Sequence, residues 1–230
     1  APQVRLIDPA PAAEHGTAFH TASLLPALSG AARVLLTGGF TPNTRRFLEP
    51  LTQDPVRVVS LAEGGSPSVA AIATYAASGA NPTYRPAGWE AATTLGSGRK
   101  VLITGGTPAQ GDSSADCAAK AQGLFCGLRQ ASLFDADQGS LQAAPLLALG
   151  RLGHRQSLLP DGTVLVSGGL VRRVQPDGTT VLTLATAEAE VFNPRQRQGA
   201  DVEDLVAGAV ARSNRSRSGT SSVLACAELK

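Results

Sequence analysis

The chain has 230 residues, enough for one well-buried domain, and 20 basic against 18 acidic residues give a net charge of only +2. This near balance argues against a nucleic-acid partner, and no apolar run is long enough to span a bilayer. The 25 glycines and 15 prolines are spread along the chain, a composition typical of many short strands joined by turns.

The predicted elements follow the same order three times along the chain. In each copy a short apolar strand and a turn lead into a strand-forming string, and the strings begin at Val34, Val101 and Val164. The turn of the third copy is Asp161-Gly162, a pair that tolerates positive φ, so we predict a hairpin in each copy. Thr or Ser and then two glycines end every string. The glycines are Gly38 and Gly39, Gly105 and Gly106, and Gly168 and Gly169.

Because glycine has no Cβ, we expect these pairs where two backbones approach closely or where φ is positive. A second strand type follows each pair, and its copies end at Glu63, Asp135 and Asn193. Residues 4–9 form a fourth copy that no hairpin precedes, so the N-terminal strand can complete a sheet that the C-terminal residues begin. We predict one domain, with repeats at 9–63, 64–135 and 136–193, and with 1–8 and 194–230 in a shared unit.

The third copy is the most complete. It contains Arg151-Leu152-Gly153-His154, Ser157-Leu158-Leu159, Asp161-Gly162, Gly168-Gly169 and Ala189-Glu190-Val191-Phe192-Asn193-Pro194. In this pattern it resembles a bacterial kelch repeat, which implies an all-β fold, a β-propeller of four-stranded blades. Gly88-Trp89 in the second copy and Phe19-His20 in the first take the place of Gly153-His154. About four repeats are recognisable, so either another blade lies within residues 65–86, or the ring is small, or another chain completes it.

Two of the three cysteines lie close together in the sequence. Cys117 and Cys126 bracket a polar loop, and in an oxidising compartment a disulfide between them would stabilise the chain by roughly 2–3 kcal/mol. The alternative is a pair of reduced thiols in a cytosolic protein. Cys226 lies in an apolar run, where we expect a small buried side chain. The chain has no Met, as after removal of a secretory signal, so we expect an exported bacterial protein.

No residue pattern predicts catalysis, a metal centre or a cofactor. The strand and glycines at 101–111 resemble the start of a dinucleotide-binding fold, but the glycine spacing is wrong. Residues 112–116 offer oxygen ligands for calcium but lack the glycine and terminal Glu of a calcium loop. There are only three histidines, too few for the ligand sets of copper oxidases. We expect His154 to form a hydrogen bond with the backbone at the start of a strand.

A further predicted hairpin follows the third glycine pair. Residues 171–175 and 179–184 flank its turn, and Arg172, Arg173 and Asp177 give it charged sides. Such a hairpin suits contact with a protein partner, and the alternative is a solvated surface element.

We therefore interpret the chain as a non-enzymatic protein-interaction or structural subunit of an exported bacterial assembly. Its partner is another protein or a second copy of the chain, and the loops after the glycine pairs would form the contact surface. The alternative is a carbohydrate-binding or carbohydrate-modifying propeller. The single tryptophan counts against this alternative, because sugar sites commonly use clustered exposed aromatic side chains.

Overall fold

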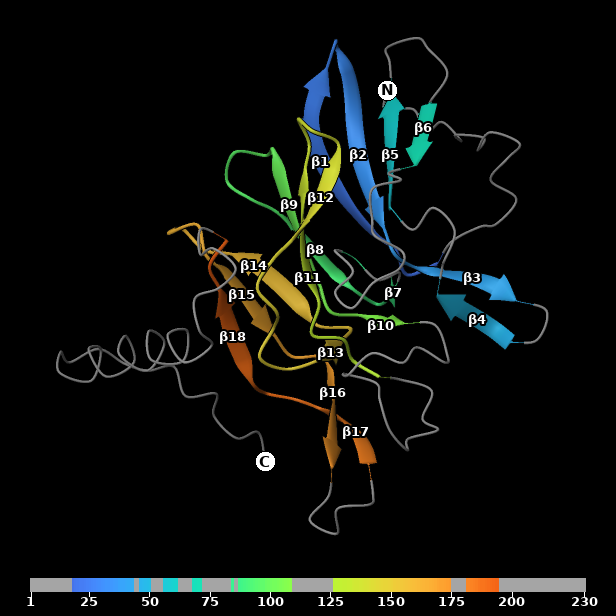
Figure 1. Ribbon diagram of the computed structural model, residues 1–230, viewed down its shortest axis with the longest axis vertical. Helices are drawn as coiled ribbons and strands as arrows, with labels where there is room; N and C mark the ends of the chain where they lie inside the picture. Colours follow the sequence, from blue (N-terminus) through green and yellow to red (C-terminus); the bar gives the residue numbers. More distant parts are fainter. Residues whose placement is uncertain are drawn as a thin grey trace, which may run out of the picture. The chain divides into compact units, whose positions relative to one another are not determined.

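The computed structural model describes residues 18–43, 46–50, 56–61, 68–71, 84, 87–108, 126–174 and 181–194. In these residues the regular elements are all strands, so the described part of the chain is all-β, as predicted (Figure 1). It holds no helix that is long and apolar enough to cross a membrane. The chain divides into two compact units, Ala1–Arg195 and Gln196–Lys230. The second unit lies outside the described residues, and the interpretation as one domain stays a prediction.

Three antiparallel sheets follow one another along the chain, each with its strands in the same order. The first sheet contains β1 (Thr21–Leu28), β2 (Ala31–Thr37), β5 (Val56–Leu61) and β6 (Ser68–Ala71). The second contains β8 (Ala91–Thr94), β9 (Lys100–Thr104), β11 (Ala131–Asp135) and β12 (Ser140–Ala143). The third contains β14 (Arg155–Leu158), β15 (Val164–Ser167) and β18 (Ala189–Phe192). The three predicted hairpins are thus confirmed, and the strand predicted after each glycine pair is the third strand of its sheet.

Immediately after each glycine pair the chain leaves its sheet and forms a shorter ladder. These ladders pair β3 (Phe40–Asn43) with β4 (Arg46–Pro50), β7 (Ala87–Gly88) with β10 (Thr107–Pro108), and β16 (Leu170–Val174) with both β13 (Arg151–Leu152) and β17 (Val181–Ala185). The β16–β17 pair is the further hairpin predicted from the sequence. Its register joins Val171 to Leu184 and Val174 to Val181.

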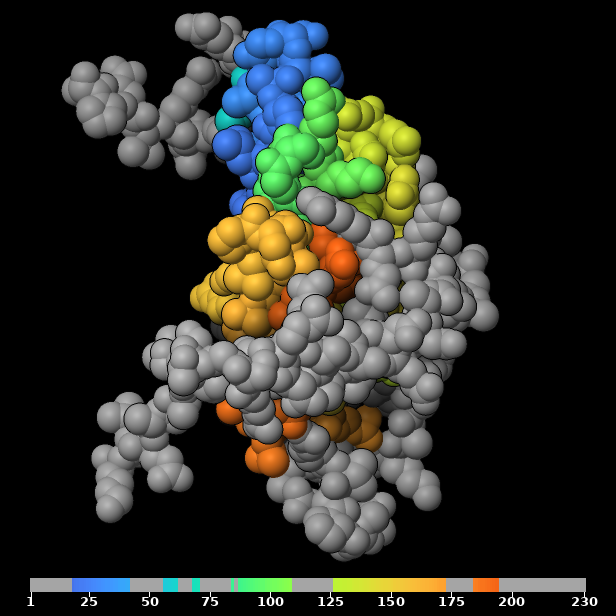
Figure 2. Space-filling view, turned by 90° about the vertical axis from the view of Figure 1, so that its left-hand side faces the viewer, coloured from blue at the N-terminus to red at the C-terminus, as the bar shows by residue number. Residues whose placement is uncertain are grey.

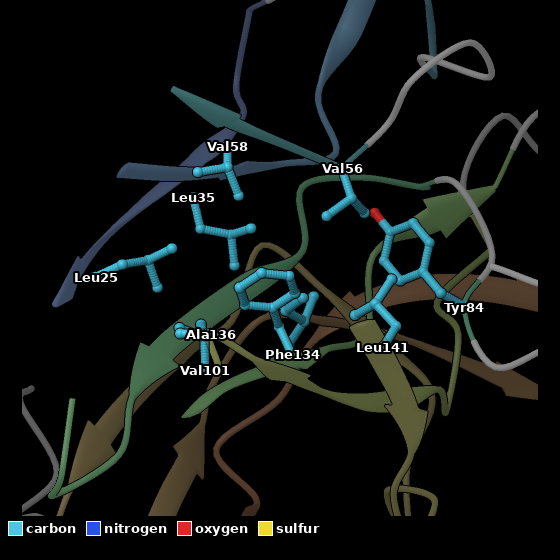
Figure 3. Close-up of a cluster of buried hydrophobic side chains, with 10 residues drawn as sticks. Leu25, Leu35, Val56, Val58, Tyr84, Val101, Phe134, Ala136 and Leu141 are labelled. Atoms are coloured by element: carbon cyan, nitrogen blue, oxygen red, sulfur yellow. The ribbon is translucent and has the colours of Figure 1, made fainter. Parts of the chain in front are cut away.

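The hydrophobic core lies between consecutive sheets. The cluster between the first and second sheets, whose side chains point toward one another in Figure 3, consists of Leu25, Leu35, Val56, Val58, Tyr84, Val101, Ile103, Phe134, Ala136 and Leu141. The cluster between the second and third sheets consists of Leu95, Leu102, Ala131, Ala144, Leu147, Val164, Val166 and Phe192.

Strand β9 contributes to both clusters because successive side chains of a strand point to opposite faces. Val101 and Ile103 belong to the first cluster, whereas Leu102 belongs to the second. All three side chains are almost completely buried. Figure 2 shows the first sheet, in blue, against the second, in green and yellow. The first strands β1, β8 and β14 are also neighbours, β1 of β8 and β8 of β14.

Candidate functional site

The junctions between consecutive sheets are the most regular feature of the described chain. The first strand of each sheet starts opposite the residue that precedes a glycine pair. The register joins Thr21 to Thr37, Ala91 to Thr104 and Arg155 to Ser167. The residues immediately before these first strands, His20, Glu90 and His154, are therefore equivalent. The residues before them, Phe19, Trp89 and Gly153, share a positive φ of 58°, 54° and 63°.

In the second repeat, this equivalence shifts the predicted alignment with the third repeat by one residue. Gly88-Trp89 was aligned with Gly153-His154, but Trp89 occupies the place of Gly153, and Glu90 occupies the place of His154. Glycine is the usual residue at a positive φ. In this chain Trp89 adopts that conformation instead, at a cost of about 1–2 kcal/mol for a residue with a Cβ.

At each described junction a glycine pair contacts the backbone four residues before the next sheet. The N–H of Gly39 donates to the carbonyl of Ala87 at 3.1 Å, and the N–H of Gly106 donates to the carbonyl of Arg151 at 2.9 Å. A Cβ on Gly105 would lie 2.5 Å from the Arg151 carbonyl oxygen, and one on Gly38 would lie 2.7 Å from a Glu90 carboxyl oxygen. All six glycines have positive φ. Both expectations for the pairs, close approach and positive φ, are therefore confirmed.

The Thr that precedes a glycine pair forms a hydrogen bond with the next sheet. Thr104 Oγ1 accepts from Gln156 Nε2 at 2.5 Å and also forms a hydrogen bond of 2.7 Å with His154 Nε2. The other ring nitrogen, Nδ1, has no hydrogen-bond partner among the described residues. The prediction that His154 forms a hydrogen bond with the backbone is wrong, because its partner is the side chain of Thr104.

Burial, with a smaller contribution from the positive charge of Arg151, lowers the pKa of His154 to about 3. The imidazole is therefore neutral at physiological pH. A neutral, 4 % exposed ring that is hydrogen-bonded to Thr104 holds two sheets together and is poorly placed to exchange protons with solvent.

Glu90 takes the same position at the first junction. Its carboxyl group accepts from the Tyr84 hydroxyl at 2.9 Å and 3.0 Å, and it forms a hydrogen bond with Thr37, the equivalent of Thr104. Burial raises the pKa of Glu90 to about 8, and the hydrogen bonds with Thr37 and Tyr84 oppose the shift without cancelling it. At neutral pH the group is mainly a protonated acid. The role of Thr37 and Thr104 explains why a hydroxyl residue precedes the glycines.

Arg151 is completely buried beside the second junction. Its Nη1 donates to the carbonyls of Gly168 at 2.9 Å and Glu188 at 3.1 Å, and its Nη2 lies 2.9 Å from Glu190 Oε1. The other oxygen of Glu190 accepts from the Ala148 N–H at 2.6 Å. These contacts fix Arg151 as a structural cation inside the third repeat.

Three aromatic rings meet at the first junction. The centroids of Phe40 and Trp89 are 4.8 Å apart, and Phe19 lies 6.2 Å from Phe40 and 6.0 Å from Trp89, all with edge-on geometry. Phe19 is 57 % exposed, whereas Phe40 is buried. No local pattern in the sequence indicates this cluster, because its members are widely separated along the chain. The signal that could have indicated it is the equivalence of Phe19 and Trp89.

Of the remaining predicted site residues, the structure describes only some. Arg172 and Arg173 lie on β16, with the Arg172 side chain partly buried. Asp177, Cys117, Cys226 and the candidate calcium loop lie outside the described residues, so the partner-contact and disulfide predictions stay predictions. Cys126 is described and half-buried. Within the described ranges no three His, Cys, Asp or Glu side chains are grouped as metal ligands.

No protein-family model and no curated protein matches the chain. Solved structures that are similar to it include two with known descriptions. One is a fungal alcohol oxidase of the AA5 family in complex with copper, with 19 % identity and a TM-score of 0.47 over 67 % of this chain and 27 % of that chain. The other is YjhT, with 14 % identity and a TM-score of 0.45 over 78 % of this chain and 46 % of that chain. The chain thus spans less than half the length of either structure.

Proposed function

We propose that the chain is a kelch-like β-propeller module that acts, without catalysis, as a protein-interaction scaffold in an exported bacterial assembly. The propeller is supported by three successive antiparallel sheets with one strand order, which pack face to face through their cores. Blades of a propeller are sheets of this kind, repeated about an axis with their first strands innermost. The neighbouring first strands β1, β8 and β14 fit that arrangement.

The interaction role rests on an apolar row across the first sheet. The row, Leu24, Val34, Val59 and Val69, is in register over four strands. Leu24 is 69 % exposed and Val69 is 45 % exposed. The equivalent row of the second sheet is Thr94, Val101, Phe134 and Leu141, and its last three members are buried, in the core shared with the first sheet.

The row that is buried in the second sheet is thus exposed at its two ends, Leu24 and Val69, in the first sheet, where Val34 and Val59 are half-buried. Repeat proteins normally give their terminal units polar outer faces, because an apolar outer face lowers solubility. A continuous apolar row that is partly exposed on an outer face is typical of protein-binding sites. We therefore expect the outer face of the first sheet to bind a protein.

The test is site-specific photo-crosslinking with a benzophenone side chain at position 24. The matched control is position 146, where the wild-type Leu146 is equally prominent at 59 % exposed but lies in a loop after β12. In the producing cells we expect a discrete protein adduct from position 24 and none from position 146. Equal labelling at the two positions, or no protein adduct at position 24, would refute the scaffold.

Carbohydrate binding is the second candidate, and the aromatic cluster favours it. Phe19 and Trp89 lie in a conformation that costs free energy, and such residues gather at ligand sites. The exposed Phe19 ring could stack on a sugar face. A glycan array probed with the wild type and with Phe19→Ala tests this: a sugar signal that Phe19→Ala removes favours the carbohydrate site, whereas the scaffold predicts no reproducible signal.

A further inference from the structure

The first and third sheets each carry one half of a junction of the kind described above, without the other half. Each described junction joins a hydroxyl residue and its glycine pair, here called the socket, to the residues just before the next sheet, here called the plug. The first junction joins the socket Thr37-Gly38-Gly39 to a plug that ends at Glu90. The second joins the socket Thr104-Gly105-Gly106 to a plug that ends at His154.

The socket of the third repeat, Ser167-Gly168-Gly169, has the same backbone conformation. Gly168 and Gly169 have φ of 67° and 89°, close to the 64° and 91° of Gly105 and Gly106. The difference lies in what covers it. A Cβ on Gly105 would meet a plug carbonyl at 2.5 Å, whereas one on Gly168 would meet nothing within 4 Å. Among the described residues, the place beside Gly168 that corresponds to the plug position at Gly105 is therefore open, whereas Gly169 packs on Leu152 and His154 of its own repeat, as Gly39 packs on His20.

The plug of the first repeat is likewise exposed among the described residues. His20 is the equivalent of Glu90 and His154, which are 5 % and 4 % exposed, yet His20 is exposed, as is the neighbouring Phe19. A histidine beside Ser167 would reproduce the described contact between His154 and Thr104.

The outer faces of the third and first sheets, which carry the socket and the plug, are also apolar like the faces that pack together within the chain. In the second sheet Leu102 and Leu133 pair across β9 and β11 and pack on the third sheet. Their equivalents in the third sheet, Leu165 and Val191, pair across β15 and β18, and Val191 is 47 % exposed. The surface that would cover them is a row like that of the first sheet, which begins at the exposed Leu24.

We propose that a second copy of this chain fills the third socket: the His20 plug and first sheet of one copy dock on Ser167-Gly168-Gly169 and the third sheet of the other, head to tail. A second copy brings both missing halves, and the chain makes the same contact twice within itself. Two copies supply twice the three sheets, which lies within the range of four to eight blades known for propellers. A head-to-tail contact that closes after two copies leaves no open end, so a dimer is the expected assembly.

This inference names the partner of the scaffold proposed above and rests on it. Light scattering and sedimentation of the full chain should give a mass near twice 23.4 kDa. A monomer at every concentration would overturn the inference, including the case in which residues 196–230 or another protein cover the socket. A monomer that still gives a protein adduct from position 24 would leave the scaffold intact, whereas loss of both would refute both.

Gly168→Ala tests the socket itself. Its methyl group meets no described residue of the same chain but would stand where a plug carbonyl must enter, so we expect the dissociation constant of the dimer to rise by at least about tenfold. Gly139→Ala is the matched control, because Gly139 has a φ of 62° and is equally open but lies in the turn between β11 and β12. An equal effect of the two substitutions on dimerisation would overturn the inference.

Mixing two defective variants tests the head-to-tail geometry. Gly168→Ala damages only the socket, and Leu24→Lys damages only the opposite face, so each alone should be monomeric. A mixture retains one intact junction, formed by the socket of Leu24→Lys and the plug of Gly168→Ala. With a mass tag on one variant, we expect a mixed dimer and no larger species. If both variants stay monomeric in the mixture, the head-to-tail contact is refuted.

Discussion

Two buried ionisable groups at the sheet junctions predict that the free energy of unfolding depends on pH along two separate limbs. In the folded chain the pKa of Glu90 is about 8 against an ordinary value of 4.5, and that of His154 is about 3 against 6.5. Both groups prefer the neutral form inside the protein, so unfolding is coupled to ionisation in opposite pH directions.

The signs follow from which state binds the proton more tightly. Above pH 4.5 unfolded Glu90 loses its proton while folded Glu90 keeps it, so stability falls as the pH rises from 4.5 to about 8. Below pH 6.5 unfolded His154 gains a proton while the folded ring does not, so stability falls as the pH drops from 6.5 to about 3. Each slope is about 1.4 kcal/mol per pH unit.

Between pH 4.5 and 6.5 the two slopes oppose each other, and we expect a plateau of maximum stability there. Outside it, the loss amounts to about 2 kcal/mol on moving from pH 6.5 to 8, and to a similar loss from pH 4.5 to 3. Urea unfolding followed by circular dichroism at pH 3 to 8.5 measures both limbs.

Two substitutions separate the limbs. Glu90→Gln keeps an amide that can pair with Tyr84 and Thr37 but cannot ionise, so the alkaline limb should flatten while the acid limb remains. His154→Gln should flatten the acid limb and leave the alkaline limb unchanged. If Glu90→Gln still lost about 2 kcal/mol between pH 6.5 and 8, the assignment of that limb to Glu90 would be refuted.

Three further substitutions test the packing of the junctions in urea unfolding. Gly105→Ala should cost about 2–4 kcal/mol against about 1 kcal/mol for Gly139→Ala, because only the first Cβ clashes with a carbonyl; equal costs would contradict the close approach. Arg151→Met should cost about 3 kcal/mol because it removes a buried cation and leaves the Glu190 carboxylate and two backbone carbonyls without their donor, and a cost below about 1 kcal/mol would show that the ion pair is dispensable. Phe19→Gly should be at least as stable as Phe19→Ala, the reverse of the usual order, because it relieves the positive φ; a less stable glycine variant would exclude strain.

Much of the local fold is predictable because it depends on neighbouring residues. Asp161-Gly162 specifies the β14–β15 turn, and the alternation in β9 places Val101 and Leu102 on opposite faces. The repeated glycine pairs also indicate close backbone contact. Such features follow from turn chemistry and from the period of two along a strand.

The side-chain partners across the junctions could not be predicted from the sequence in the same way. His154 meets Thr104 over a separation of 50 residues, and no local pattern encodes that pairing. Glu90 was missed because an acidic residue is normally exposed, and only the surrounding sheet, with Tyr84, removes it from water. Positive φ at Trp89 was missed because tertiary packing overrides the usual preference for glycine.

The glycine pairs bear on how a chain of this kind can change in length. The contact from Gly39 to Ala87 is made again from Gly106 to Arg151, and it uses only main-chain atoms on both sides. Side chains as different as a carboxyl and an imidazole accompany it. Because the connection does not depend on a particular side chain, tandem duplication of one coding segment would add a unit that fits both of its neighbours at once.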